Sequence, residues 1–315
     1  MTSKFRVPPF LNHDTMIGRL DWPGAVEALR KGHGLPAAQI KDVFLGPPNG
    51  TMMSRSAYID GLGYGAKTFT VLDGNAARGL PTVQGAMLVF DKDDGSLQAI
   101  VDSALVTEFK TAADSVLGAS LLARPDSRHL LVVGAGTVAA SLVNAYAAAL
   151  PGLERISVWS RRLEQAQQLV AGLGDRGVDM AAVVDLRAAI ASADIVSSAT
   201  MARQPVIPGD WVRPGTHVDL IGAFKADMRE ADDVLMAKAS LFVDSRETAL
   251  HIGELIQPIA SGAITADSIL GDLYDLVHPE ARRRQSDDDI TLFKNGGGAH
   301  LDLMIASWIA QVTMS

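Results

Sequence analysis

The residues with the clearest chemistry follow an apolar run and read Gly-x-Gly-x-x-Ala at positions 134–139. Gly134 permits a tight turn, Gly136 lets a phosphate approach the backbone, and the small Ala139 lets a helix pack closely on the strand before it. The free N–H groups where the helix begins, at Thr137 and Val138, favour an anion. Glycine-rich turns also occur in unrelated loops, but here a strand-like run precedes the turn and a helical pattern follows. The pattern therefore predicts a dinucleotide site.

A second group of residues bears on which dinucleotide binds. NAD-selective proteins usually place Asp or Glu at the end of the second strand, where it bonds the ribose hydroxyls. This chain reads Ser160-Arg161-Arg162 there, with no carboxylate. A guanidinium binds a phosphate dianion through two parallel hydrogen bonds, which favours NADP(H) over NAD(H). The alternative is an exposed arginine pair at a helix start, which is common.

Three cations occupy positions where the pattern predicts a core face. Arg55 alternates with Met53 and Ala57 in one expected strand, and Lys67 alternates with Phe69 in the next. Lys110 lies in a helix rich in Ala, Val and Leu. Cations are seldom fully buried without a partner, so the three together predict a pocket for a carboxylate. The alternative is that each side chain reaches solvent at a sheet edge.

Other chemistries find little support. None of the four tyrosines has a lysine four residues later, the seven histidines form no His-Glu-x-x-His motif, and no Gly-x-Ser-x-Gly occurs. We therefore expect no metal site and no nucleophilic triad. His217 is interpreted as a structural, hydrogen-bonded histidine, and Glu247 and Glu254 are expected to stabilise their own helix.

Composition narrows the class of protein. The 315 residues are 48% hydrophobic and 20% charged, which fits a globular chain with a sizeable core. A formal net charge of −8 argues against nucleic acid or an anionic membrane as a partner. The absence of cysteine fits a reducing cytoplasm, and the N-terminus lacks an apolar segment of signal-peptide length. Residues 130–150 carry no charge, but the glycine turn divides them into a strand and a helix, so we expect no membrane span.

The order of expected elements predicts an α/β fold. Strands and helices alternate over residues 130–245, which is typical of a Rossmann-type, doubly wound parallel sheet. The first 105 residues instead predict antiparallel strands at 52–59, 65–72 and 86–90, followed by a helix at about 104–123. A strand at 290–294 and an apolar helix at 301–312 follow the nucleotide domain. We expect that helix to return to the N-terminal α+β domain, which gives domains of 1–112 with 291–315, and 113–290.

In combination, these segments resemble the ornithine cyclodeaminase/μ-crystallin family from about Met52 to the C-terminus. The segments that carry the resemblance are residues 65–67, 79–85, 110–113, 134–136, 159–161, 222–223 with 229–232, 243–247 and 291–294. Each is weak alone, and their order is specific. The resemblance implies a homodimer in which the N-terminal domain and the final helix form the substrate and dimerisation domain. It also implies NAD(P)-dependent chemistry at the carbon–nitrogen bond of an amino or imino acid.

The resemblance further implies roles for particular residues. Arg55, Lys67 and Lys110 would hold the substrate carboxylate, and four residues would lie near the nicotinamide end of the cofactor, namely Thr200, Val218, Gly222 and Lys294. Two positions depart from the family pattern. Lys110 replaces an arginine, which keeps the charge but loses the planar fork. Phe224 replaces an aspartate that cyclodeaminases carry and that is thought to shuttle protons.

Phenylalanine cannot shuttle a proton, so we expect reduction of the C=N bond of a small α-imino acid such as pyrroline-2-carboxylate. Hydride transfer to an iminium demands orientation and electrostatics more than a general base. Phe224 would then form an apolar wall beside the substrate, and Lys67 would donate a proton. The alternatives are an ornithine cyclodeaminase, which forms proline and ammonia, and a non-catalytic protein that binds NADPH or another small molecule. The residues leave the substrate and the direction of reaction in the cell open.

Overall fold

The structure, a computed structural model, describes residues 7–16, 18–47 and 49–314. It divides into two compact units. The first unit comprises Met1–Lys110 and Gly298–Ser315, and the second unit comprises Thr111–Gly297. The division falls within one long helix, α3 (Ser103–Leu122), which begins in the first unit and ends in the second.

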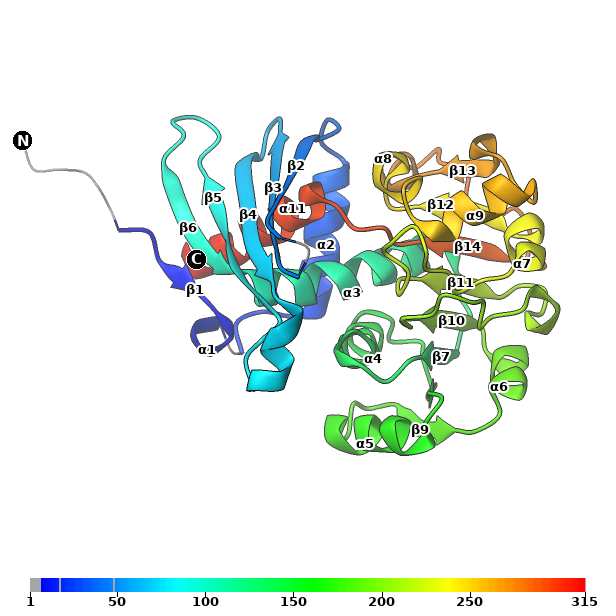
Figure 1. The fold of residues 1–315 in the computed structure, drawn as a ribbon. Helices are drawn as coiled ribbons and strands as arrows, with labels where there is room; N and C mark the ends of the chain where they lie inside the picture. Colours follow the sequence, from blue (N-terminus) through cyan, green and yellow to red (C-terminus); the bar gives the residue numbers. More distant parts are fainter. Residues whose placement is uncertain (1–6, 17, 48, 315) are drawn as a thin grey trace, which may run out of the picture. The chain divides into compact units, whose positions relative to one another are not determined.

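The first unit is built on a six-stranded sheet in the order β1-β6-β5-β4-β3-β2 (Figure 1). All neighbouring strands pair antiparallel except β1 and β6, which pair parallel. The strands are β1 (Phe10–Leu11), β2 (Gln39–Leu45), β3 (Thr51–Ile59), β4 (Gly63–Val71), β5 (Val83–Phe90) and β6 (Leu97–Asp102). The helices are α1 (His13–Met16), α2 (Trp22–His33), a 3-10 turn η1 (Asp73–Arg78) and α11 (Ala299–Met314).

Helix α11 covers one face of this sheet, which we call the inner face. The helix contacts β2 to β6 on one side and α2 on the other. Two-residue alternation places Ala57, Ile59, Met87 and Val89 on the inner face, where all four are buried. The opposite, outer face has no covering helix among the described residues of the first unit, and several of its side chains are exposed. A sheet with one packed face and one open face explains the clear alternation in the sequence.

The second unit contains an eight-stranded parallel sheet in the order β13-β12-β14-β11-β10-β7-β8-β9. Its strands are β7 (His129–Val133), β8 (Arg155–Trp159), β9 (Asp179–Val183), β10 (Ile195–Ser198), β11 (His217–Leu220), β12 (Ser240–Val243), β13 (Ile269–Gly271) and β14 (Thr291–Lys294). Its helices are α4 (Thr137–Ala149), α5 (Leu163–Leu173), α6 (Leu186–Ser192), α7 (Asp233–Lys238), α8 (Arg246–Ala249), α9 (Gly253–Ser261) and α10 (Leu273–Leu276), with 3-10 turns η2 (Gly209–Trp211) and η3 (Ala266–Ser268). The strand order, with β7 at the point where it reverses, confirms the Rossmann-type doubly wound fold.

The position of β14 corrects the expected boundary at residue 291. We expected the whole segment 291–315 to belong with the N-terminal region, but β14 pairs in parallel with both β11 and β12. Only the helix that follows it, α11, belongs to the first unit. All four residues of β14 are buried, and a strand buried on both faces fits a parallel sheet rather than a sheet with an open face. Among the helices that the structure describes, none is both long and apolar enough to cross a membrane.

Candidate functional site

A row of charged side chains crosses the inner face of the first sheet. Arg55 on β3 and Lys67 on β4 are direct partners across the two strands, and Asp42 on β2 is the partner of Arg55 on its other side. Both carboxylate oxygens of Asp42 accept hydrogen bonds from Arg55 Nε, at 3.1 and 3.0 Å, and Oδ2 also lies 2.9 Å from Nη2. The structure thus brings two of the three expected cations together and adds a carboxylate that we did not expect.

Lys67 is held by two oxygen atoms from outside its own sheet. Its ammonium donates hydrogen bonds to Thr107 Oγ1 on α3 and, over 3.1 Å, to Asp302 Oδ1 on α11. The Thr107 hydroxyl donates its own proton to the Ser103 carbonyl at 2.7 Å, so only its lone pairs face Lys67. The Lys67 and Asp302 side chains are 5% and 2% exposed. Two of the three ammonium protons are therefore committed, which fixes the direction of the third.

Lys110 joins the same cluster. Burial raises the pKa of the Asp302 carboxyl, but the positive charges of Lys67, Lys110 and Arg55 outweigh this effect and lower the pKa. Two residues before Asp302 on the same helix, His300 is buried beside His33, with ring centroids 5.6 Å apart. Burial lowers the pKa of His300 well below 6.5 and that of His33 to about 4. Both histidines are therefore neutral at physiological pH, and Asp302 is ionised.

This arrangement suits a small organic acid. Within the first unit, the positive charges of Arg55, Lys67 and Lys110 gather around the Asp302 carboxylate, and such a concentration of positive charge attracts an anion. Beyond Lys67 on the inner face, Phe69 and Met53 are partly exposed and Phe44 is 63% exposed. The Lys67 ammonium lies 5.5 Å from the centre of the Phe69 ring. The cluster thus offers charge for one carboxylate and, beside it, apolar surface for a hydrocarbon body.

In the second unit, the glycine turn between β7 and α4 has an open backbone. Gly134 has φ +128°, and a Cβ there would lie 2.6 Å from the Ala199 carbonyl oxygen, so only glycine fits. A Cβ on Gly136 would meet no atom within 4 Å. Gly136 is the N-cap of α4, no side chain caps the helix, and Gly136, Thr137 and Val138 are exposed. Backbone N–H groups at this helix start are therefore available to an anion such as a pyrophosphate.

The end of β8 presents the expected arginine pair. The Ser160 hydroxyl donates to the Arg162 carbonyl at 2.8 Å and fixes the turn into α5. Arg161 and Arg162 are exposed, and neither forms an ion pair with the described residues. Two uncommitted guanidinium groups at the carboxyl end of the second strand fit a phosphate.

One buried carboxylate joins the loops that follow β10 and β11. Glu230 Oε1 accepts hydrogen bonds from Ser198 Oγ, Thr200 N and Thr200 Oγ1 at 2.6, 2.8 and 2.7 Å. Its Oε2 accepts from the N–H groups of Gly222 and Ala223 at 2.6 and 3.2 Å. Two of the expected nicotinamide-end residues, Thr200 and Gly222, are thus held next to each other. A Cβ on Gly222 would collide with Thr200 backbone atoms, so this position requires glycine.

The other two expected nicotinamide-end residues, Val218 and Lys294, are fully buried. The Lys294 ammonium donates to the Leu220 carbonyl at 2.8 Å. Its charge lowers the pKa of Asp219 and of Asp244, but burial is the larger effect on both and raises the pKa of Asp219 to about 7. Val218 and Lys294 therefore lie beneath the carboxyl edge of the sheet and support it from within.

Glu254 also differs from expectation. We expected this residue to stabilise its own helix, but its carboxylate accepts the N–H groups of Glu230 and Ala231 at 2.8 and 2.9 Å. Burial raises the pKa of Glu254, and the nearby Glu230 charge raises it further. His217 agrees with its structural interpretation, since it is buried and bonded to Thr291 Oγ1 at 2.9 Å.

Phe224 follows β11 in the second unit, whereas the cationic cluster lies in the first. Its ring is 52% exposed and lies 5.4 Å from the Lys225 ammonium. Such an exposed ring beside the Gly222 turn can contact a ligand without first leaving a core. Among the described residues, no group of three or more acidic or histidine side chains is placed to hold a metal ion.

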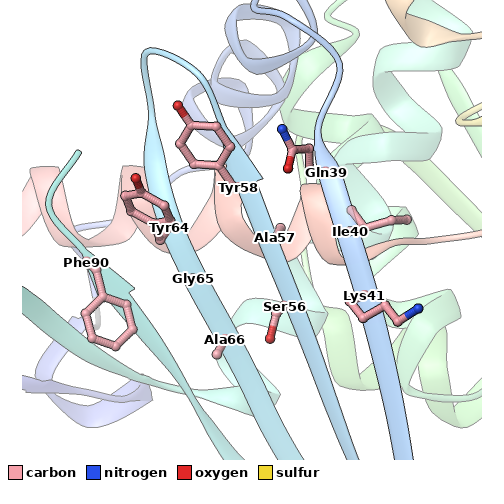
Figure 2. Close-up of a pocket in the computed structure, with 10 residues that line it drawn as sticks. All are labelled: Gln39, Ile40, Lys41, Ser56, Ala57, Tyr58, Tyr64, Gly65, Ala66 and Phe90. Atoms are coloured by element: carbon pink, nitrogen blue, oxygen red, sulfur yellow. The ribbon is translucent and has the colours of Figure 1, made fainter. Parts of the chain in front are cut away.

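A separate pocket of about 450 Å³ lies on the outer face of the first sheet (Figure 2). Its walls include Tyr58 and Tyr64, whose rings stack with centroids 4.7 Å apart, together with Lys41 and Phe90. These side chains alternate with Arg55 and Lys67 and therefore point to the opposite face. Figure 2 shows α11 behind the strands, on the side of the cationic cluster.

The comparison with known proteins agrees with this geometry. Residues 34–314 match the ornithine cyclodeaminase/mu-crystallin family. The chain belongs to this family. It is 79% identical over 313 residues to a Delta(1)-pyrroline-2-carboxylate reductase of Paracoccus denitrificans, covering 99% of each chain. A Delta(1)-pyrroline-2-carboxylate reductase of Thermococcus litoralis, solved with NADH and L-proline, has a TM-score of 0.89 at 26% identity, covering 97% of each chain. An archaeal alanine dehydrogenase dimer with bound NAD has a TM-score of 0.88 at 26% identity, covering 98% of this chain and 96% of that one.

Sequence reasoning missed several members of the site. Asp42 lies on a strand that we did not expect, and Thr107 and Asp302 lie in helices whose patterns are largely apolar. Asp302 carried a detectable signal, because a lone acidic residue inside the apolar helix 301–312 requires a buried partner. Lys67 is the buried cation that pairs with Asp302.

Proposed function

We propose that this protein is an NAD(P)H-dependent reductase that converts the C=N bond of a small cyclic α-imino acid, Δ1-pyrroline-2-carboxylate, to the amino acid. The observation that carries the proposal is the cluster of Arg55, Lys67 and Lys110 held around Asp302 in one unit. The 79% identical relative with the same printed activity supports this choice of substrate.

The first unit holds the acid. Lys110 binds the carboxylate together with the Arg55 guanidinium atoms that Asp42 does not engage, and the nearby positive charge of Lys67 attracts it. Because Thr107 and Asp302 already accept hydrogen bonds from the Lys67 ammonium, its third N–H would serve the substrate. Reduction of the C=N bond would turn the imine nitrogen into a basic amine, and Lys67 would supply the proton that this nitrogen takes up. The apolar side chains Phe69 and Met53 accept the ring.

The second unit holds the cofactor, and the reduced nicotinamide supplies the hydride when bound. The N–H groups at Gly136, Thr137 and Val138 receive the pyrophosphate, and Gly134, whose own N–H donates to the Trp159 carbonyl at 2.8 Å, makes the tight turn that leads to them. Thr200 and Gly222, held by Glu230, line the nicotinamide end, which Val218 and Lys294 support from below. Phe224, which is exposed beside the Gly222 turn, would form an apolar wall at the nicotinamide end and exclude water there.

We further propose a preference for NADPH over NADH. Ser160, Arg161 and Arg162 would bind the 2′-phosphate, because both arginines are exposed and uncommitted and no carboxylate is present to bond a free ribose hydroxyl. A reductase that draws on NADPH fits a cytoplasmic location.

A homodimer through the outer face of the first sheet is also proposed. That face exposes Phe10, Val43, Leu45, Met52 and Tyr64, each at least 37% accessible. Apolar patches of this kind on one sheet usually mark an interface. Light scattering of the purified protein tests this, and Val43→Lys with Leu45→Lys should shift the dimer to a monomer.

The activity test uses the purified chain with pyrroline-2-carboxylate or piperideine-2-carboxylate, and follows the loss of NADPH or NADH absorbance. Rapid consumption with a cyclic imine supports the proposal. Formation of ammonia and proline from ornithine and NAD would replace it with cyclodeamination. Binding of NADPH without turnover of any imino or amino acid would replace it with a binding protein.

A further inference from the structure

Asp42 occupies a position that the proposed reaction does not use. It lies on the edge strand β2, on the inner face, in line with Arg55 and Lys67. Three hydrogen-bonding contacts of 2.9 to 3.1 Å join its carboxylate to the Nε and Nη2 side of Arg55. The side chains are 27% and 18% exposed, so solvent reaches the pair. One side of the guanidinium is therefore already bound by a carboxylate of the protein itself.

The charges around this pair leave little attraction for a second anionic group. Asp42 and Asp302 balance two of the three cations of the first unit. The neighbouring histidines, His33 and His300, are neutral. At most one positive charge is left, which is enough for one carboxylate.

The apolar surroundings of the cluster also disfavour a second carboxylate on the ligand. The inner-face neighbours of Asp42, Arg55 and Lys67 along their own strands are all uncharged, namely Ile40, Phe44, Met53, Ala57, Gly65 and Phe69. A second carboxylate on the ligand would lie either against these apolar groups, without a partner, or against Asp42, where like charges repel.

We propose that Asp42 is a specificity-determining residue that restricts the site to acids with a single carboxylate. This inference rests on the proposed function, since it takes the cluster to be the substrate site. Asp42 acts in two ways: it occupies the side of Arg55 that would bind a second carboxylate, and its own charge repels that group. α-Imino acids with an uncharged body fit, and α-imino dicarboxylates do not.

Calorimetric titration with two stable planar probes, pyrrole-2-carboxylate and pyrrole-2,5-dicarboxylate, tests the proposal. The wild type should bind the monocarboxylate at least ~10-fold more tightly, because removing or adding one nearby charge is worth at least a factor of ten at a partly buried site. Asp42→Asn should reduce the ratio of the two dissociation constants, dicarboxylate over monocarboxylate, by ~10-fold or more. Asp42→Glu, which restores the charge, should keep the wild-type ratio. Asp60→Asn, an exposed position in the β3–β4 turn, changes the net charge equally and should leave the ratio unchanged.

Asp42→Ser serves as a second neutral variant if Asp42→Asn does not fold, as judged by circular dichroism. An unchanged ratio in the folded neutral variant, or equal binding of both probes by the wild type, would overturn the proposal. Turnover of pyrroline-2-carboxylate by the wild type is measured separately. A wild type that binds the probes selectively but reduces no imine would contradict the proposed function and leave the role of Asp42 in place.

Discussion

The contact between Lys67 and Asp302 gives the sharpest quantitative prediction. Its atoms lie 3.1 Å apart with both side chains almost fully buried. Removing one partner of a buried pair leaves an uncompensated charge and typically costs about 3–5 kcal/mol. In Asp302→Asn the amide oxygen can still accept a hydrogen bond from the ammonium. We therefore expect a loss of ~3 kcal/mol in the free energy of unfolding at neutral pH, at the lower end of that range.

Urea denaturation of a double-mutant cycle measures the contribution. Lys67→Met and Asp302→Leu should each destabilise the protein, whereas the double variant should recover much of the loss, because two apolar side chains can replace a buried ion pair. Activity should not recover in the double variant, since the proposed site needs the ammonium. Glu154→Gln, which removes the exposed Arg128–Glu154 pair, is the control and should cost less than ~1 kcal/mol.

The pH dependence provides a second check on the same pair. Although burial raises the pKa of Asp302, the three cations lower it below the ordinary value of 3.8. A lowered pKa gives stability that is present above pH 3.8 and is lost as the pH falls through the folded-state value. The difference between wild type and Asp302→Asn should therefore persist at pH 7 and shrink in acid. A cost below ~0.5 kcal/mol at pH 7, or additive single-variant effects, would refute the idea that Asp302 holds Lys67.

Three further predictions concern the second unit. Arg161→Ser with Arg162→Ser should raise the KM for NADPH by ~10-fold or more and change that for NADH little, because even one lost charge-assisted hydrogen bond is worth about 1.5–3 kcal/mol; steady-state kinetics with both cofactors will decide. Phe224→Ala should lower kcat/KM for the imine by ~10-fold without changing the melting temperature, since the ring is half exposed; an unaltered kcat/KM would remove its proposed role. Burial raises the pKa of Asp219 from 3.8 to about 7, so its contribution to stability is present below pH 3.8 and is lost as the pH rises through 7. Urea denaturation at several pH values in this range should show that the free energy of unfolding depends less on pH in Asp219→Asn than in the wild type. The two proteins should differ in this pH dependence by at most ~4 kcal/mol. Parallel pH profiles would contradict the raised pKa of Asp219.

Much of the fold could be predicted because its signals are local. The glycine turn after β7, the buried strands of the second unit and the alternation in β3 and β4 each follow from residues close together in the sequence. The strands β2 and β6 and the helix α2 were missed. The β2 segment carries Lys41 and Asp42 at adjacent positions, and its apolar residues are largely exposed, so its hydrophobic signal is weak.

The candidate site likewise contains residues that could be predicted from the sequence and partners that could not. Arg55 and Lys67 could be assigned to one face because each contradicts the alternation of its own strand. Their partners could not be assigned, because Asp302 is 235 residues from Lys67 and nothing in the sequence specifies which strands α11 covers. The partners of Glu230 and Glu254 could not be predicted for a related reason: both carboxylates bond backbone N–H groups, which nearly every residue carries and no motif reveals.

The sequence by itself determined the class of fold, the glycine turn between a strand and a helix of the second unit, and the presence of three cations that each need a partner. It could do so because glycine requirements, hydrophobic periodicity and the cost of burying a charge are properties of individual residues and their near neighbours. Only the tertiary structure decided that β14 enters the second sheet, that α11 returns to the first unit, and that Asp42 and Asp302 flank the cations. Those outcomes depend on which distant surfaces bury each other, and complementary packing of that kind is a property of the whole chain.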